Sequence, residues 1–275
     1  MDKYIQVHFA AVDAIKQDIL IAELASIGFD GFEQGPDYLN AFLPENSFNR
    51  LDLHTIPGMQ THRPTISLIE PRNWNEEWEK SFEPVIIDEF CAIRASFHPP
   101  VAGVQHEIVI TPKMSFGTGH HATTYQMIRL MKEIDFSNKT VVDFGTGTGV
   151  LAILAYKLGA AHICAIDNDE WSINNARENV ENNGSSTIQL NMSDTLPNNE
   201  LFDIILANIN KHVILENLPE ISKQLRPGGV VLLSGLLQND QREIVDAALK
   251  NRLFVKTQSQ KYDWIALCFT NVNQV

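Results

Sequence analysis

The stretch that most constrains this chain is residues 140–154, which read TVVDFGTGTGVLAIL. Apolar and β-branched residues lead to Asp143, glycines follow at alternate positions, and an apolar run of helical character begins at Val150. This order predicts a strand, a tight turn and a helix. Alternate glycines let a ligand approach the main chain closely. The start of the helix offers N–H groups to an anionic group, so the stretch predicts a nucleotide-like ligand.

The spacing of the glycines indicates which ligand the turn suits. Gly145, Gly147 and Gly149 follow the pattern G-x-G-x-G, whereas dinucleotide-binding turns carry G-x-G-x-x-G, and no Lys-Ser or Lys-Thr pair closes a P-loop. With Asp143 ahead of it, this turn resembles the first motif of S-adenosylmethionine-dependent methyltransferases, in which the loop packs against the methionine part of the cofactor. The alternative is a turn that serves only close packing of a strand and a helix.

Composition narrows the choice of compartment and partner. The chain has 275 residues and three widely spaced cysteines without C-x-x-C spacing, which predicts neither a disulfide framework nor a zinc site. We therefore expect a cytoplasmic protein, and no apolar run reaches the length of a membrane span. The formal net charge of -13 disfavours a nucleic-acid backbone as the main ligand and favours a small molecule or a basic protein.

Residues 1–70 predict a small α+β domain. The expected elements are, in order, strand 4–9, helix 14–24, strands 29–32 and 38–43, helix 47–53 and strand 65–69. This is the order of a ferredoxin-like unit, and because it carries no visible chemistry we interpret it as a domain for substrate recognition or packing.

Two further stretches lie between this domain and the glycine turn. Trp74, Trp78 and Phe82 recur every four residues, which predicts a linker helix over residues 71–82 with one apolar face. Residues 114–124 then form a second glycine-rich loop that we expect to fold over the ligand. In this loop the adjacent His120 and His121 side chains diverge, so we interpret them as rim residues rather than metal ligands.

Polar residues that end the predicted strands are the candidate site. Asp167 follows a strand, where its carboxylate can accept both ribose hydroxyls of a nucleoside, while Asp169 is better placed to cap the next helix. Asp194 either faces an adenine amino group or begins a turn. Asn208 ends the next strand at the carboxyl edge, where open α/β sheets place their sites.

The final two strands define the fold class. The runs 253–257 and 264–270 have too few residues between them for a crossover, so they must pair antiparallel. Residues 83–275 therefore predict an α/β domain with a seven-stranded, mostly parallel, Rossmann-like sheet that contains one reversed strand. This arrangement is typical of class I methyltransferases and not of dehydrogenase domains.

Several of these motifs occur together and in order. The loop 116–124, the Asp143 turn, Ala207-Asn208-Ile209, Ser234-Gly235 and the Trp74 and Trp78 pair together resemble the ribosomal protein L-eleven methyltransferase (PrmA) family. The resemblance runs from the linker to the C-terminus. It implies a recognition domain for a large-subunit ribosomal protein and a domain that transfers methyl groups from S-adenosylmethionine to lysine side-chain amines and an N-terminal amine.

The resemblance also implies roles for single residues. It makes Thr124 a cofactor contact, Gly145 a loop glycine beside the cofactor, Asp167 the ribose acid and Asn208 the residue next to the methyl donor, with Asp143, Gly147 and Asp194 completing the expected cofactor site. It implies neither a metal, nor direct binding of nucleic acid, nor a membrane, and we expect a monomer. Two departures concern the acceptor pocket: His120-His121-Ala122 replaces Thr-His-Pro, and Asn210-Lys211 replaces Leu-Ala.

Amine methylation needs a free lone pair on the nitrogen. We hypothesise that the Asn208 side-chain oxygen accepts an N–H of the incoming amine; the alternative is that Asn208 holds only the strand end or the cofactor. A methyltransferase for nucleic acid or glutamine amides is the nearest rival, yet residues 209–211 supply no Pro-Pro and no stacking aromatic. A non-catalytic interaction protein would need neither the glycine turn nor Asp167 and Asn208.

Overall fold

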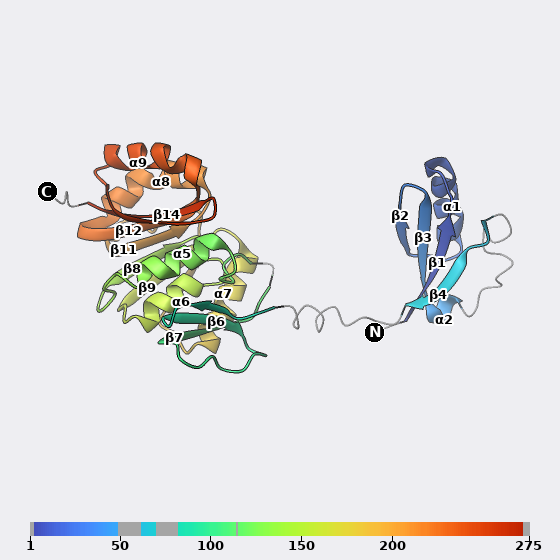
Figure 1. The fold of residues 1–275 in the computed structure, drawn as a ribbon, viewed down its shortest axis with the longest axis horizontal. Coiled ribbons are helices and arrows are strands. Elements are labelled where there is room, and N and C mark those ends of the chain that lie inside the picture. The colour runs from blue at the N-terminus through green and yellow to red at the C-terminus, as the bar shows by residue number, and fades with distance from the viewer. Residues whose placement is uncertain (1–2, 49–61, 70–81, 114, 272–275) are drawn as a thin grey trace. The chain divides into compact units, whose positions relative to one another are not determined.

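The computed structural model describes residues 3–48, 62–69, 82–113 and 115–271 (Figure 1). The chain divides into two units, Met1–Ser81 and Phe82–Val275. The linker helix expected over residues 71–82 lies outside the described residues, except for Phe82. No described helix is long and apolar enough to cross a membrane.

The first unit contains a four-stranded antiparallel sheet in the order β2-β3-β1-β4. Its elements are β1 (Tyr4–Ala10), α1 (Ala14–Ser26), β2 (Gly31–Gln34), β3 (Tyr38–Pro44), α2 (Glu45–Phe48) and β4 (Thr65–Ile69). This is the predicted ferredoxin-like arrangement. Val7, Phe9, Leu24 and Leu39 are fully buried between sheet and helix. The helix expected over residues 47–53 begins earlier, at Glu45, and residues 49–61 lie outside the described residues.

The second unit is organised around a seven-stranded sheet in the order β10-β9-β8-β11-β12-β14-β13. Its strands are β8 (Thr140–Phe144), β9 (His162–Asp167), β10 (Gln189–Met192), β11 (Phe202–Asn208), β12 (Leu225–Leu237), β13 (Phe254–Lys261) and β14 (Trp264–Thr270). β14 pairs antiparallel with both neighbours, whereas β10, β9, β8, β11 and β12 pair parallel with one another. The predicted reversed strand is therefore confirmed.

Helices cover both faces of this sheet (Figure 1). They are α5 (Ala122–Met131), α6 (Val150–Lys157), α7 (Glu170–Asn182), α8 (Lys211–Gln224) and α9 (Gln241–Lys250). Along β8, Val141 packs in the core that contains α5 and α6, while Val142 packs in the core that contains α8 and α9. Burial on both faces explains why the central strands β8 and β11 are mostly apolar.

A second, three-stranded sheet precedes α5. It consists of β5 (Val85–Ile87), β6 (Cys91–Ala95) and β7 (His106–Ile110). Two asparagine side chains bind the backbone at the end of β7. One is Asn179 of α7, and the other is Asn183, the C-cap residue of α7. Val109 N–H donates to Asn183 Oδ1 (3.0 Å), and Thr111 N–H donates to Asn179 Oδ1 (2.7 Å). The two asparagine side chains thus take the place of a neighbouring strand as hydrogen-bonding partners of this backbone. They join the three-stranded sheet to the seven-stranded sheet through α7.

Three features of the second unit differ from the prediction or add to it. The loop expected over residues 114–124 ends earlier, because α5 begins at Ala122, where the His121 side chain accepts the Thr123 N–H and caps the helix. β12 begins at Leu225, where residues 226–229 form a bulge between two paired positions. α9 was not predicted, although its apolar residues follow a helical pattern in which Ile244 and Ala248, four residues apart, are buried.

Candidate active site

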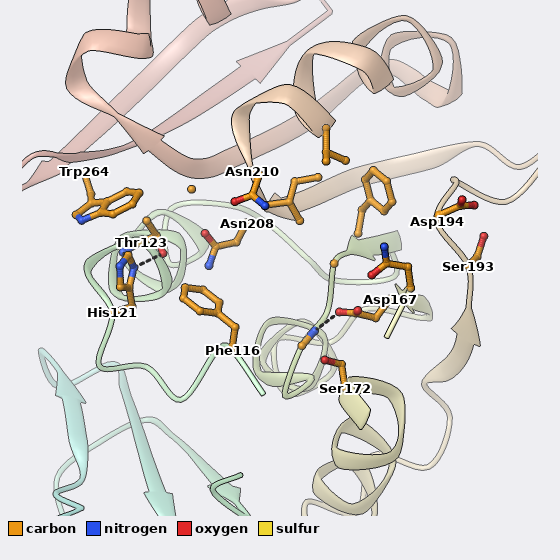
Figure 2. Close-up of a pocket in the computed structure, with 17 residues that line it drawn as sticks. Phe116, His121, Thr123, Asp167, Ser172, Ser193, Asp194, Asn208, Asn210 and Trp264 are labelled. Carbon is orange, nitrogen blue, oxygen red and sulfur yellow. Dashed lines mark hydrogen bonds between the residues drawn. The ribbon is translucent and has the colours of Figure 1, made fainter. Parts of the chain in front are cut away.

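A cavity of about 480 Å³ lies at the carboxyl edge of the seven-stranded sheet (Figure 2). It is lined by Phe116, His121, Thr123, Phe144, Gly145, Gly147, Asp167, Asn168, Ser172, Ser193, Asp194, Asn208, Ile209, Asn210, Val213, Gly235 and Trp264. These residues come from the ends of β8, β9, β10 and β11, from β12 near its end, from the start of the reversed β14, and from the loops and helix starts beside them. The position is the one that open α/β sheets use for ligands.

The glycine turn forms the floor of this cavity. Gly145 and Gly147 adopt φ values of +76° and +55°. A Cβ on Gly147 would lie 2.3 Å from the carbonyl oxygen of Phe116, and a Cβ on Gly145 would lie 2.2 Å from Ile209 Cγ2. Both positions therefore require glycine, for conformation and for space.

Asp143 lies beneath this floor and does not line the cavity. Its fully buried Oδ2 accepts hydrogen bonds from the Thr146 hydroxyl (2.6 Å) and from the Ala152 N–H (3.2 Å). The start of α6, which the sequence offered to a ligand anion, is therefore contacted by the protein's own carboxyl group. Burial raises the pKa of Asp143 to about 7, although the bonds from Thr146 and Ala152 oppose this rise.

This raised pKa makes the stability of the unit depend on pH. Because the folded state holds the Asp143 proton more tightly than the unfolded chain, the contribution is complete below about pH 4 and is lost as the pH rises through about 7. We expect the free energy of unfolding of wild type to fall relative to that of Asp143→Asn between about pH 4 and about pH 7, on the order of a few kcal/mol. Denaturant titrations of both proteins measure this difference, and parallel curves would contradict the assignment.

Acidic and hydroxyl groups gather at one end of the cavity. Asp167, Ser172, Ser193 and Asp194 lie together on that side in Figure 2. Asp167 Oδ2 accepts the Gly147 N–H (2.8 Å) and Oδ1 accepts the Asp169 N–H (3.1 Å), so the carboxylate is held in place. As expected, Asp169 caps α7, accepting the Ser172 N–H.

Aromatic side chains form the opposite end (Figure 2). The His121 ring meets Trp264 edge to face at 4.7 Å and Phe116 at 5.2 Å between ring centroids. His121 was expected at the rim, but Phe116 and Trp264 were not singled out. The sequence could have indicated Trp264. It is the first residue of the reversed strand, and a reversed strand begins at the edge of the sheet where its parallel neighbours end.

Asn208 lies between the two ends. Its Nδ2 donates to the Thr124 hydroxyl (3.2 Å), while its buried Oδ1 has no protein partner. A buried amide oxygen without a donor costs free energy unless a ligand supplies one. The fully buried Thr124 therefore contacts Asn208 and does not itself line the cavity.

The charge of the lining favours a cationic ligand. None of the described lining residues is Lys or Arg, whereas Asp167 and Asp194 contribute carboxylates. A pyrophosphate would lack a countercharge here, while a sulfonium or an ammonium group is compatible with the site. The described residues contain no cluster of His, Cys, Asp or Glu that could hold a metal ion.

The residues that depart from the resembled family pattern have defined places. Asn210 lines the cavity, but Lys211 forms ion pairs with Asp240 (2.9 Å) and Glu243 (3.1 Å). His120 also lies outside the lining, where its Nε2 is 3.0 Å from the Glu83 carbonyl oxygen. Among the expected cofactor residues, Gly145, Gly147, Asp167, Asp194 and Asn208 line the cavity, and Asp143 and Thr124 support it from behind.

Comparisons with known proteins agree on one family. The profile of "Ribosomal protein L11 methyltransferase (PrmA)" matches residues 38–272. The ribosomal protein L11 methyltransferase of Porphyromonas gingivalis is 39% identical over 264 residues, covering 92% of this chain and 90% of that protein. That of Chlorobaculum tepidum is 41% identical and covers 84% of each chain. The solved ribosomal protein L11 methylase from Lactobacillus delbrueckii subsp. bulgaricus is similar with a TM-score of 0.65 and 30% identity, covering 69% of this chain and 98% of that chain.

Proposed function

The chain belongs to the ribosomal protein L11 methyltransferase family, and on this premise we propose that it transfers methyl groups from S-adenosylmethionine to amines of ribosomal protein L11. The acceptors are lysine side-chain amines and the N-terminal amine. The observation that carries this proposal is the unpartnered Asn208 Oδ1 at a cavity whose described lining has carboxylates but no Lys or Arg.

The cofactor residues are assigned on the geometry of the cavity. Asp167 accepts the ribose hydroxyls, Asp194 faces the adenine end, and Gly145 and Gly147 leave room for the methionine part. Asp143 and Thr124 act indirectly, Asp143 by fixing the glycine turn and Thr124 by fixing Asn208. When bound, S-adenosylmethionine supplies an electrophilic methyl group on a sulfonium.

Asn208 positions the acceptor. Its Oδ1 accepts one N–H of the incoming amine, so that the nitrogen lone pair is aimed toward the cofactor end of the cavity. A lysine ammonium must first lose a proton, and burial among Phe116, His121 and Trp264 favours the neutral amine. Holding the nitrogen in this orientation supplies much of the acceleration.

The N-terminal unit, residues 1–70, recognises the ribosomal protein, while residues 71–82 link it to the catalytic domain 83–275. Support for recognition comes from exposed acidic residues near β2 and β3, namely Asp30, Glu33 and Asp37. Ribosomal proteins that bind RNA are basic, so an acidic surface is complementary. The enzyme acts in the cytoplasm as a monomer and needs no direct contact with nucleic acid.

The test is transfer with purified components. Incubation of the chain and S-adenosylmethionine with L11 should add methyl-sized mass increments, and peptide mapping should place them on amines. Peptides modified only on glutamine amides, or transfer to RNA with unmodified L11, would overturn the proposed acceptor.

A further inference from the structure

Thr148 is a polar residue of the glycine turn that does not line the cavity. Its backbone N–H, its hydroxyl and its carbonyl oxygen all form hydrogen bonds within the protein. It is fully buried. Its N–H donates to the Phe116 carbonyl oxygen (2.9 Å), and its hydroxyl donates to the Gly117 carbonyl oxygen (2.7 Å). Its own carbonyl oxygen accepts from Asn179 Nδ2 (2.8 Å). One residue thus joins the two glycine-rich loops to α7.

The two loops approach each other backbone to backbone at this point. A Cβ on Gly117 would lie 2.7 Å from the Thr148 hydroxyl oxygen, and a Cβ on Gly147 would lie 2.3 Å from the Phe116 carbonyl oxygen. The Thr148 hydroxyl itself lies against Gly117, so the Thr148 bonds help to set the distance between the two segments. Phe116, which is half exposed, has its backbone anchored here and its ring in the cavity.

Each end of the cavity is connected to Thr148 through direct contacts. On the acidic side, the N–H of Gly147, the residue before Thr148, donates a hydrogen bond to Asp167. On the aromatic side, Phe116 meets the His121 ring, which meets Trp264. Asn179, which is fully buried, also accepts the Thr111 N–H, so the anchor is fixed to the neighbouring sheet.

We propose that Thr148 is a positioning residue that holds the Phe116 wall of the acceptor end at a fixed distance from the cofactor turn. This inference rests on the proposed function of the site. Removal of the hydroxyl breaks the bond to Gly117 and leaves the loop held to the turn only by the Thr148 N–H at Phe116, so the Phe116 wall is loosened, whereas the backbone of the turn, Asp167 and the cofactor contacts stay in place. Thr148 therefore affects binding and alignment of the amine more than affinity for the cofactor.

The test compares Thr148→Val, which keeps the shape but loses the hydroxyl, with Thr148→Ser, which keeps the hydroxyl. For Thr148→Val we expect kcat/KM for L11 to fall about tenfold, while the Kd for S-adenosylhomocysteine changes less than about twofold. Thr148→Ser should recover most of the activity. Ser222→Ala removes a comparable hydroxyl-to-carbonyl bond, to Asn251, at the end of α8 and is the control for general loss of stability.

A double-mutant cycle separates positioning from a merely structural role. If Thr148 acts through Phe116, Thr148→Val should have little further effect in a Phe116→Ala background, whereas independent losses would multiply. Independent losses, an equal fall in cofactor affinity, or no rescue by serine would each overturn the proposal. Amide hydrogen exchange of residues 115–119 should also rise in Thr148→Val. This readout needs no substrate, so inactivity of wild type on L11 would refute the proposed function while the exchange result still decides the role of Thr148.

Discussion

Asn208→Ala should lower kcat about a hundredfold while the Kd for S-adenosylhomocysteine changes only a few-fold. The reason is the position of the side chain: Oδ1 is buried without a protein donor, and Nδ2 is fixed by Thr124. Truncation removes the acceptor for the amine N–H but leaves Asp167 and the glycine turn untouched. Single-turnover kinetics together with calorimetric titration of the cofactor product measure the two quantities separately.

Asn217→Ala is the matched control for this variant. Asn217 also uses its Nδ2 in a hydrogen bond, to the Val213 carbonyl oxygen within α8, but it does not line the cavity. The control should retain wild-type kcat. Equal losses of turnover and of cofactor affinity in Asn208→Ala would show that Asn208 holds the cofactor or the strand end, and the orienting role would be wrong.

Gly147→Ala should abolish measurable cofactor binding and activity. The left-handed φ of +55° alone costs an alanine about 1 kcal/mol or more. The added Cβ would also meet the Phe116 carbonyl oxygen at 2.3 Å, which is a backbone atom and cannot rotate away. To relieve this contact, one of the two segments must move. Movement of the turn would displace the Gly147 N–H that holds Asp167, and movement of the other segment would displace the Phe116 wall.

A second glycine separates the effect of conformation from the effect of contact. Gly103 also has a positive φ, +82°, but a Cβ there would meet nothing within 4 Å. Gly103→Ala should therefore lose some thermal stability and keep its affinity for S-adenosylhomocysteine. If Gly147→Ala binds the cofactor product as tightly as Gly103→Ala does, the close packing of the two loops does not matter for the site.

The sequence predicted those features that a short local pattern determines. The glycine turn at Gly145 and Gly147, the acid at the end of β9 and the reversed β14 all follow from spacing and from chain connectivity. The elements of the N-terminal unit follow from alternating apolar residues, and their sheet order agrees with a ferredoxin-like unit.

Long-range contacts account for what the sequence did not predict. Asp143 was expected beside the cofactor. Its carboxyl group instead lies beneath the glycine turn and accepts the Ala152 N–H, and a linear motif does not reveal this orientation. Phe116, Asn208 and Trp264 are far apart in the sequence but line one cavity, so only the topology brings them together. The sequence analysis did not single out Thr148, because its role in joining two loops depends on the fold.

The measurement that tests the central claim most directly is the intact mass of L11 from matched cells with and without this gene. The account predicts that L11 from cells lacking the gene loses methyl-sized mass increments, that wild-type chain restores them, and that Asn208→Ala does not restore them to the wild-type level. An unchanged L11 mass in the absence of the gene, with S-adenosylmethionine still binding the purified protein, would contradict the assigned substrate while leaving the fold and the cofactor in place.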